Sequence, residues 1–492
     1  MTISRDPREV LKDRPSGWLI FGLVVGGLCA LVSFSFDVLD GDPVQFFIAL
    51  ILAMAPVPLL LAVVLALDRL EPEPPSNLIF AFVWGAGVSV LVAGIINTLG
   101  LFYITRSADV PFDDARSIIA TFGAPLVEET LKGLVLLGLL KFRRWELNGP
   151  TDGIIYASMV GLGFAMSENV SYYVAAQGGP YGVQGLAVTV VLRGVLSPFA
   201  HPLFTSMIGI AVAAAAHRQG PIRAVILLGG WGGAMLLHGL WNGLASYGGF
   251  GGLAVAYLVL MIVLVALIGV IVRDRKRIVA LLQHYLPAYQ STGLITPADV
   301  QMLSSLPERR SARQWSKAHG GQGGLRAMKD FQLAATELGL LHERASRGVV
   351  AENAFYAEQQ ALLQALQQAK SGLPETPPFA GPYGMHPGRG PGYPGQGYPG
   401  GPGTYGGRPG QGPGPYGMPP AQPPGQGPGY PGQGYPGGPG TYGGRPGQGP
   451  GPYGMPPAQP PGQGPGYPGQ GYPGGLGAYG GRPGQGPGPY HR

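Results

Sequence analysis

The stretch SIIATFGAPLVEETLKGLVLLGLL, residues 117–140, decides the fold. It is long and apolar enough for a membrane-spanning helix, which needs about 20 mostly apolar residues. Yet it carries Glu128, Glu129 and Lys132 near its centre. An ionised group at bilayer depth costs about 2.5–3.5 kcal/mol or more, so it usually faces a partner or a water-filled cavity. The stretch therefore predicts a membrane helix whose polar side chains face an interior site.

The next three apolar stretches of helical length also carry an ionisable residue each. These residues are Glu168, His201 and His238. Glutamate and histidine are residue types that activate water or bind a metal. Their recurrence in four consecutive stretches predicts one shared site.

The whole sequence predicts an all-α polytopic membrane protein with about eight transmembrane helices. The fourth to seventh are less hydrophobic than the others, as expected of helices that line a cavity while the rest face lipid. The predicted spans are residues 17–36, 44–67, 78–104, 117–140, 153–175, 186–217, 222–247 and 252–272.

Composition excludes several other classes of protein. Mean hydropathy is only +0.18 because a polar tail dilutes an apolar first half. The net charge of +6 does not indicate nucleic-acid binding, since much of the basic charge lies beside apolar segments. A single cysteine, Cys29, can form neither an intrachain disulfide nor a cysteine-rich zinc site.

Charged loops predict the orientation. Basic residues cluster before the first span and after the fourth, sixth and eighth spans. By the positive-inside rule these loops and both termini lie in the cytoplasm. At 1.5 Å per residue, Glu128, Glu168 and His238 then lie about 10–16 Å from the outer surface and His201 about 20 Å.

The fourth span carries a charged pair. Glu128 and Lys132 are four residues apart and share a helix face. Glu129 lies beside Glu128, and adjacent carboxylates raise each other's proton affinity, which suits a base and a proton carrier. The alternative is an ion-pair cluster that only fixes packing.

The fifth and sixth spans add further polar groups. Glu168 precedes Asn169, a pairing that can bind a metal, polarise a peptide or simply join helices. In the sixth span Pro198 and Pro202 flank His201 and loosen the helix there. Arg193, nearer the outer surface, is expected to extend its side chain outward.

In the seventh span His238 and Asn242 share a face and can donate hydrogen bonds to an oxyanion. Alternatively, His238 completes a metal site with His201 and Glu168, which matches the three protein ligands of catalytic zinc.

Together these elements resemble the PrsW family of bacterial intramembrane proteases and, more distantly, the CAAX-processing and Abi membrane proteases. The resemblance covers roughly residues 50–275. The matching elements are Glu-Glu-x-x-Lys (Glu128, Glu129, Lys132), Phe-x-x-x-Glu-Asn (Phe164, Glu168, Asn169), His201, and His-x-x-x-Asn (His238, Asn242).

The resemblance implies peptide-bond hydrolysis in a bacterial cytoplasmic membrane, with an anti-sigma factor as substrate. It leaves two mechanisms open, a zinc metalloprotease and a glutamate-dependent protease. In the related CAAX enzymes a glutamate and a histidine activate water while a histidine and an asparagine form the oxyanion hole. The Phe-x-x-x-His element of that superfamily reads Phe-x-x-x-Glu here, so water activation must use His201 or differ in detail.

Four regions are predicted along the chain: a cytoplasmic N-terminus at 1–16, a protease domain at 17–277, cytoplasmic helices at 278–372 and a tail at 373–492. In the third, Thr296, Pro297 and Asp299 indicate a helix start, and further helices are expected near 324–346 and 350–370.

The tail is rich in Gly, Pro and Tyr and repeats every 37 residues, beginning at Tyr393, Tyr430 and Tyr467. With almost no aliphatic residues it cannot bury a core, which predicts disorder. It is either a solvated spacer or a segment that binds partners weakly through Tyr and Arg.

Besides the lipid bilayer, the expected partner is a membrane-protein substrate, with no nucleic acid. Two other functions fit the same residues. A transporter or channel could relay protons or ions through buried Glu and His, and a scaffold could keep the site without catalysis.

Overall fold

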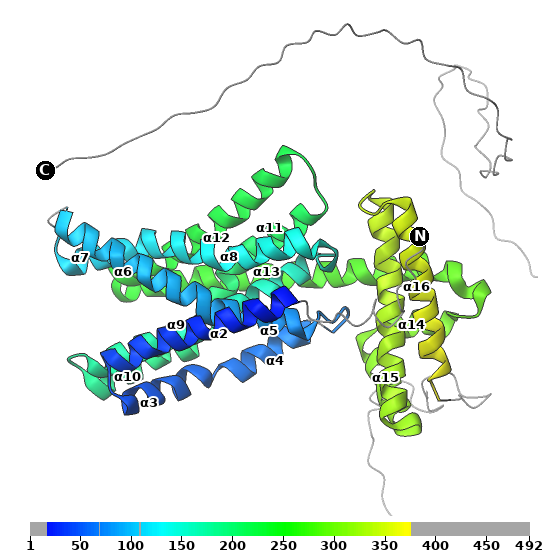
Figure 1. Ribbon diagram of the computed structural model, residues 1–492, viewed down its shortest axis with the longest axis horizontal. Coiled ribbons are helices and arrows are strands. Elements are labelled where there is room, and N and C mark those ends of the chain that lie inside the picture. The colour runs from blue at the N-terminus through cyan, green and yellow to red at the C-terminus, as the bar shows by residue number, and fades with distance from the viewer. Residues whose placement is uncertain (1–16, 68, 108–109, 375–492) are drawn as a thin grey trace, which may run out of the picture. The chain divides into compact units, whose positions relative to one another are not determined.

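The computed structural model describes residues 17–67, 69–107 and 110–374 (Figure 1). These residues are mainly helical and contain no strand, so the predicted all-α class is confirmed. The predicted N-terminal region and the predicted disordered tail lie outside the described residues, except for residues 373 and 374.

Twelve α-helices make up the described residues up to position 285, several of them joined end to end (Figure 1). They are α2 (Gly17–Asp40), α3 (Pro43–Met54), α4 (Val57–Leu67), α5 (Pro75–Val83), α6 (Val90–Ser107), α7 (Phe112–Ile118), α8 (Ala124–Phe142), α9 (Pro150–Gly178), α10 (Gly182–Thr189), α11 (Ala200–Ala216), α12 (Pro221–Tyr247) and α13 (Gly249–Tyr285).

Six helical segments within the described residues are long and apolar enough to cross a membrane, which supports a multi-pass membrane protein. They are Gly17–Asp40, Pro43–Leu67, Pro75–Ser107, Gly182–Ala216, Pro221–Tyr247 and Gly249–Thr292. The two remaining predicted spans, in α8 and α9, carry the glutamates and are not among the six. The count of eight therefore stays a prediction.

Helix α9 is buried along most of its length and packs against α11, α5 and α3. Glycines allow the backbones to approach closely. A Cβ atom added at Gly209 of α11 would lie 2.1 Å from the carbonyl oxygen of Gly153 on α9. A Cβ atom added at Gly153 would lie 2.1 Å from the carbonyl oxygen of Gly209. On its other side α9 contacts the segment around Gly85, where a Cβ would lie 2.1 Å from the oxygen of Val160.

Three π-helical segments interrupt the membrane helices: η1 (Trp84–Ser89), η2 (Ile119–Gly123) and η4 (Val190–Leu196). After η4 the chain leaves the helix at residues 197–199, and α11 begins at Ala200. The predicted sixth span is therefore two helices with Pro198 in the break, and His201 lies in the first turn of α11. Such irregular turns are frequent at functional sites.

The remaining helices are α14 (Pro297–Leu303), α15 (Leu306–Ser346) and α16 (Glu352–Ser371). Thr296 and Asp299 form the expected reciprocal cap at the start of α14. Helix α15 consists of two helices joined at a kink at Gly321, whose φ of +58° is readily adopted only by glycine. The second agrees with the helix predicted near 324–346, and the first begins at Leu306.

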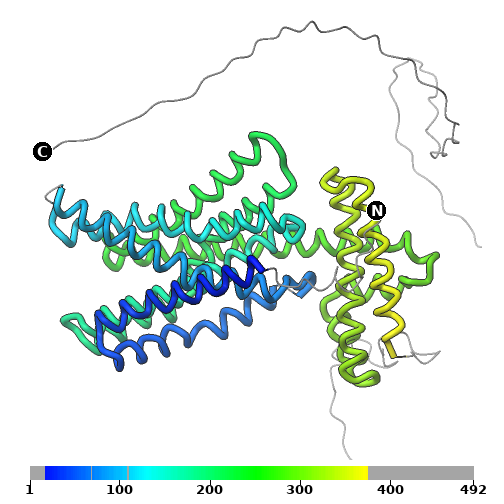
Figure 2. The backbone as a smooth tube through the Cα atoms, viewed as in Figure 1, coloured from blue at the N-terminus to red at the C-terminus, as the bar shows by residue number. Residues whose placement is uncertain are grey.

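Helix α13 runs without interruption through the boundary predicted at residue 277 and continues to Tyr285 (Figure 2). Two buried arginines of α15 then contact loops between the membrane helices. Arg309 donates to the carbonyl oxygen of Leu70 at 3.0 Å, and Arg344 donates to that of Trp145 at 3.0 Å. Both arginines thus join α15 to the membrane helices.

The glycine contact between α9 and α11 can be tested. Gly209→Leu should force the two helices apart and destabilise the protein by about 1–3 kcal/mol, the usual cost of overpacking. Gly138→Leu is the matched control because a Cβ there meets no atom within 4 Å. Thermal unfolding of the purified protein in detergent measures both. Equal melting temperatures for the two variants would contradict this packing.

Candidate active site

Three helices bring five of the predicted residues to one buried polar centre. Helix α8 supplies Glu128, Glu129 and Lys132, while α11 supplies His201 and α12 supplies His238. Glu129 and Lys132 are fully buried and the other three are at most 8% exposed. The sequence-based expectation of a shared site thus agrees with the positions of these side chains.

Lys132 lies at the middle of this centre. Its ammonium nitrogen is 2.9 Å from Glu129, 3.3 Å from Glu128 and 3.0 Å from Nδ1 of His201. The same nitrogen lies 3.6 Å above the ring of Phe164. A buried ammonium needs this compensation, because an unpaired charge in a low-dielectric interior is strongly unfavourable.

Glu129 is held by three short hydrogen bonds. It accepts from Lys132 at 2.9 Å and from Thr205 at 2.9 Å, and its Oε1 lies 3.0 Å from Nδ1 of His238. Thr205 is one turn after His201 on α11, a position that sequence reasoning did not single out. The i, i+4 spacing from His201 is the signal that could have found it. Glu129 therefore fixes α8, α11 and α12 relative to one another.

Glu128 is held more loosely than its neighbour. Its nearest contacts are Lys132 at 3.3 Å, Asn97 at 3.5 Å and Nε2 of His238 at 3.9 Å. Asn97, on α6, was also missed by sequence reasoning. Because these contacts are long, the Glu128 carboxylate has more freedom than that of Glu129.

Glu168, on α9, lies on the far side of His201. Its Oε2 is 3.0 Å from Nε2 of His201 and accepts a short hydrogen bond from Arg193. Arg193 also donates to Asn169 at 2.8 Å and lies over the ring of Tyr172. The expectation that Arg193 extends outward was wrong, because the paired acceptors of α9 hold its guanidinium.

Asn242 lies apart from these contacts. Its amide donates to the carbonyl oxygen of Ala120 at 2.8 Å, within the π-helical segment η2. It thus joins α12 to the start of α8. Its role as an oxyanion donor stays a prediction.

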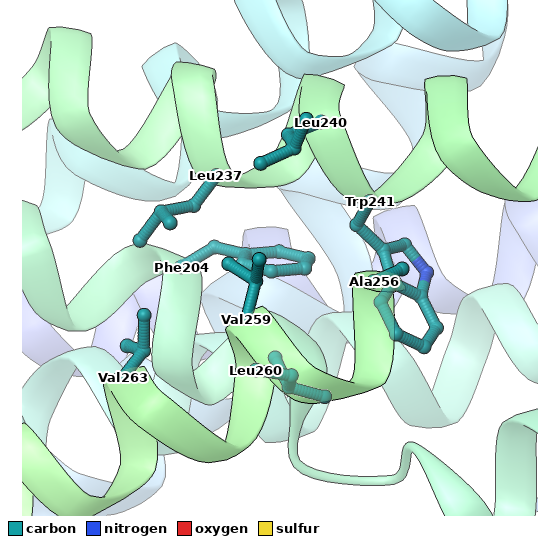
Figure 3. Close-up of a pocket in the computed structure, with 8 residues that line it drawn as sticks. All are labelled: Phe204, Leu237, Leu240, Trp241, Ala256, Val259, Leu260 and Val263. Carbon is teal, nitrogen blue, oxygen red and sulfur yellow. The ribbon is translucent and has the colours of Figure 1, made fainter. Parts of the chain in front are cut away.

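Aromatic rings enclose the two histidines. Phe164 contacts His201, with ring centroids 5.1 Å apart, and Phe204 stacks on His238 at 5.0 Å. Phe204 also lines an apolar pocket between α12 and α13, with Leu237, Leu240 and Trp241 on one side and Ala256, Val259, Leu260 and Val263 on the other (Figure 3). The polar centre therefore borders an apolar hollow.

The donor atoms of Glu128, His201 and His238 all lie within 4.8 Å of one another, so these three residues form a candidate metal site. Glu128 takes the place that sequence reasoning gave to Glu168. The chemistry of this set fits zinc, which favours two histidines and a carboxylate in hydrolases. Glu129 and Glu168 each hold the other ring nitrogen of one histidine, as carboxylates commonly do behind metal ligands. Lys132 lies against two of the same donors and would compete with a metal for them.

Removing the charge of Lys132 should lower the free energy of unfolding. Lys132→Met would leave Glu129 and Glu128 buried without their ammonium, and breaking a buried pair in this way costs about 3–5 kcal/mol. Lys141→Met, an exposed lysine on the same helix, should change stability by less than about 0.5 kcal/mol. Chemical denaturation of both variants in the same detergent is the measurement. Unfolding of Lys132→Met at the denaturant concentration of the wild type would show that the cluster does not depend on this charge.

Comparison with known proteins identifies a related family. Residues 73–268, which include every residue of the site, match the family described as PrsW family intramembrane metalloprotease. Proteins named Protease PrsW are 30% identical over 165 residues in Clostridioides difficile, 28% over 160 in Oceanobacillus iheyensis and 29% over 142 in Geobacillus kaustophilus.

These alignments cover 33%, 32% and 29% of this chain and 64%, 67% and 55% of the three relatives, so the chain spans about two thirds or less of each. No solved structure matches the chain. The four motifs and these matches agree, and the resemblance to the PrsW family of intramembrane proteases is confirmed for the membrane segment from 73 to 268.

Proposed function

We propose that this chain is an intramembrane endopeptidase that hydrolyses a peptide bond of a membrane protein. The observation that carries the proposal is the contrast between two adjacent glutamates. Glu129 is fixed by three contacts of 2.9–3.0 Å, whereas the contacts of Glu128 are 3.3 Å or longer. A carboxylate with only long contacts, beside a tightly hydrogen-bonded polar centre, is suited to take a proton from water.

The carboxylates set the tautomers of both histidines. A carboxylate only accepts hydrogen bonds, so Glu129 favours a proton on Nδ1 of His238 and Glu168 favours one on Nε2 of His201. Neutral His238 then offers the lone pair of Nε2, which lies 3.9 Å from Oε2 of Glu128. One water molecule can bridge two acceptors at this separation by donating a hydrogen bond to each.

Hydrolysis then follows from these positions. Glu128 takes a proton from the water while the water oxygen attacks the peptide carbonyl carbon. The ammonium of Lys132, 3.3 Å from Glu128, stabilises the negative charge that develops. The second N–H of the Asn242 amide is a further donor for the oxyanion, since Ala120 takes only the first. The proton on Glu128 passes to the leaving nitrogen.

The family description favours a metal, and a donor set of one carboxylate and two imidazoles favours zinc. When it is bound by Glu128, His201 and His238, zinc supplies a Lewis acid for the carbonyl and a more acidic water. In that case Glu129 and Glu168 orient the two imidazoles, as they do in the contacts described above.

The substrate we propose is a single-pass protein of the bacterial cytoplasmic membrane, and the family resemblance favours an anti-sigma factor. Basic clusters such as residues 273–277 support an orientation with both termini in the cytoplasm.

The role of Glu128 has a direct test. Glu128→Gln should lower cleavage of a single-pass reporter in proteoliposomes by about 10²–10⁴-fold, the usual contribution of a general base. Its melting temperature should stay close to that of the wild type because the Glu128 contacts are long. Glu352→Gln, in the exposed first turn of α16, is the control. Wild-type cleavage by Glu128→Gln would remove this residue from the mechanism, and solute or proton flux without cleavage would favour a transporter.

Glu129→Gln should behave differently from Glu128→Gln. The substitution replaces an ionised acceptor of three buried hydrogen bonds, from Lys132, Thr205 and His238, by a neutral amide. It should therefore lower both stability and cleavage. Thermal unfolding of the two variants side by side is the measurement. A Glu129→Gln protein as stable as Glu128→Gln would contradict the division between a positioning and a reactive carboxylate.

A further inference from the structure

A basic groove lies between the loop after α4 and the first half of α15, outside the site described above. Its volume is about 380 Å³. Five of its lining side chains are cationic, those of Arg69, Arg310, Arg313, Lys317 and Lys329, and none of the described residues that line it is acidic.

The positive charge of this groove has no acidic partner among the described residues that line it. By contrast, Lys132 is paired with Glu129 and Arg277 with Asp274. None of the five groove cations forms an ion pair within the described part of the chain. Partial burial and the nearby charges of Arg69 and Arg310 lower the pKa of Arg313, as expected where like charges converge.

The groove is built on fixed contacts. Arg309, adjacent to Arg310, is 2% exposed and donates to the carbonyl oxygens of Leu70 and Leu303 at 3.0 and 2.8 Å. It also donates to Thr336 at 2.9 Å, on the second half of α15. These bonds fix the start of α15 to the loop that carries Arg69, so the groove cations are held together before any ligand arrives.

The groove also lies at a membrane boundary. Arg69 follows by two residues the end of the membrane segment Pro43–Leu67. Two leucines, Leu306 and Leu325, lie among the cations, and Gln314 offers an amide. Cations beside apolar side chains suit a ligand with a phosphate group joined to an apolar part.

We propose that this groove binds the phosphate headgroup of an anionic phospholipid. The lack of acidic side chains among the described lining residues argues against a structural ion-pair network, and the position of Arg69 favours a ligand that comes from the bilayer. Binding would hold the first half of α15 at the membrane surface. This proposal is independent of the peptidase assignment because it concerns binding alone.

The test is a titration of the detergent-solubilised full chain with dioctanoyl phosphatidylglycerol, followed by native mass spectrometry. Wild-type protein should bind it saturably, and dioctanoyl phosphatidylcholine should bind much more weakly. Lys317→Gln/Lys329→Gln changes two exposed groove residues and should weaken phosphatidylglycerol binding roughly tenfold or more at low salt, since each basic residue contributes about 1 kcal/mol, or fivefold.

The matched control is Arg218→Gln/Arg326→Gln, which removes two exposed charges outside the groove. It should retain binding within about twofold. Equal losses in both double variants would overturn the proposal, because the effect would then depend on net charge alone. Inorganic phosphate or an acidic peptide bound with higher affinity than phosphatidylglycerol would also overturn it, because the ligand would then be soluble.

Discussion

The buried ammonium of Lys132 is the interaction on which the rest of the site depends. Two carboxylates and an imidazole converge on it from α8 and α11, and Glu129 continues the network to His238 on α12. In a low-dielectric interior such a network is stable only if each member has its partner. The helices are therefore constrained to one mutual arrangement, and that arrangement leaves Glu128 the least restrained of the acids.

The polar network and the glycines of α9 have complementary effects. Gly153 and Gly209 bring the backbones of α9 and α11 into contact. This close approach places Glu168 at 3.0 Å from His201. Small residues thus set the distance between helices, and the charged residues set their register.

Much of this arrangement was predictable from residue type and depth. Glutamate and histidine are too costly in lipid to lie apart, so the convergence of α8, α11 and α12 followed from the sequence alone. The position of the Arg193 side chain could not be predicted from the sequence. Whether it reaches the outer surface or Glu168 depends on the geometry of η4, which no local pattern encodes. The difference in contact distances between Glu128 and Glu129 could not be predicted, since it depends on where Thr205, Asn97 and His238 lie on other helices.

The length of α13 adds a continuous connection between the membrane helices and α15, which Arg309 and Arg344 also join. At 1.5 Å per residue its 37 residues extend for about 55 Å. Near one end Ala256 and Leu260 form a wall of the hollow beside Phe204, and towards the other Arg277 contacts Glu343 of α15. Because a continuous helix resists bending, α13 fixes the distance between its contact with α15 and the lining of that hollow.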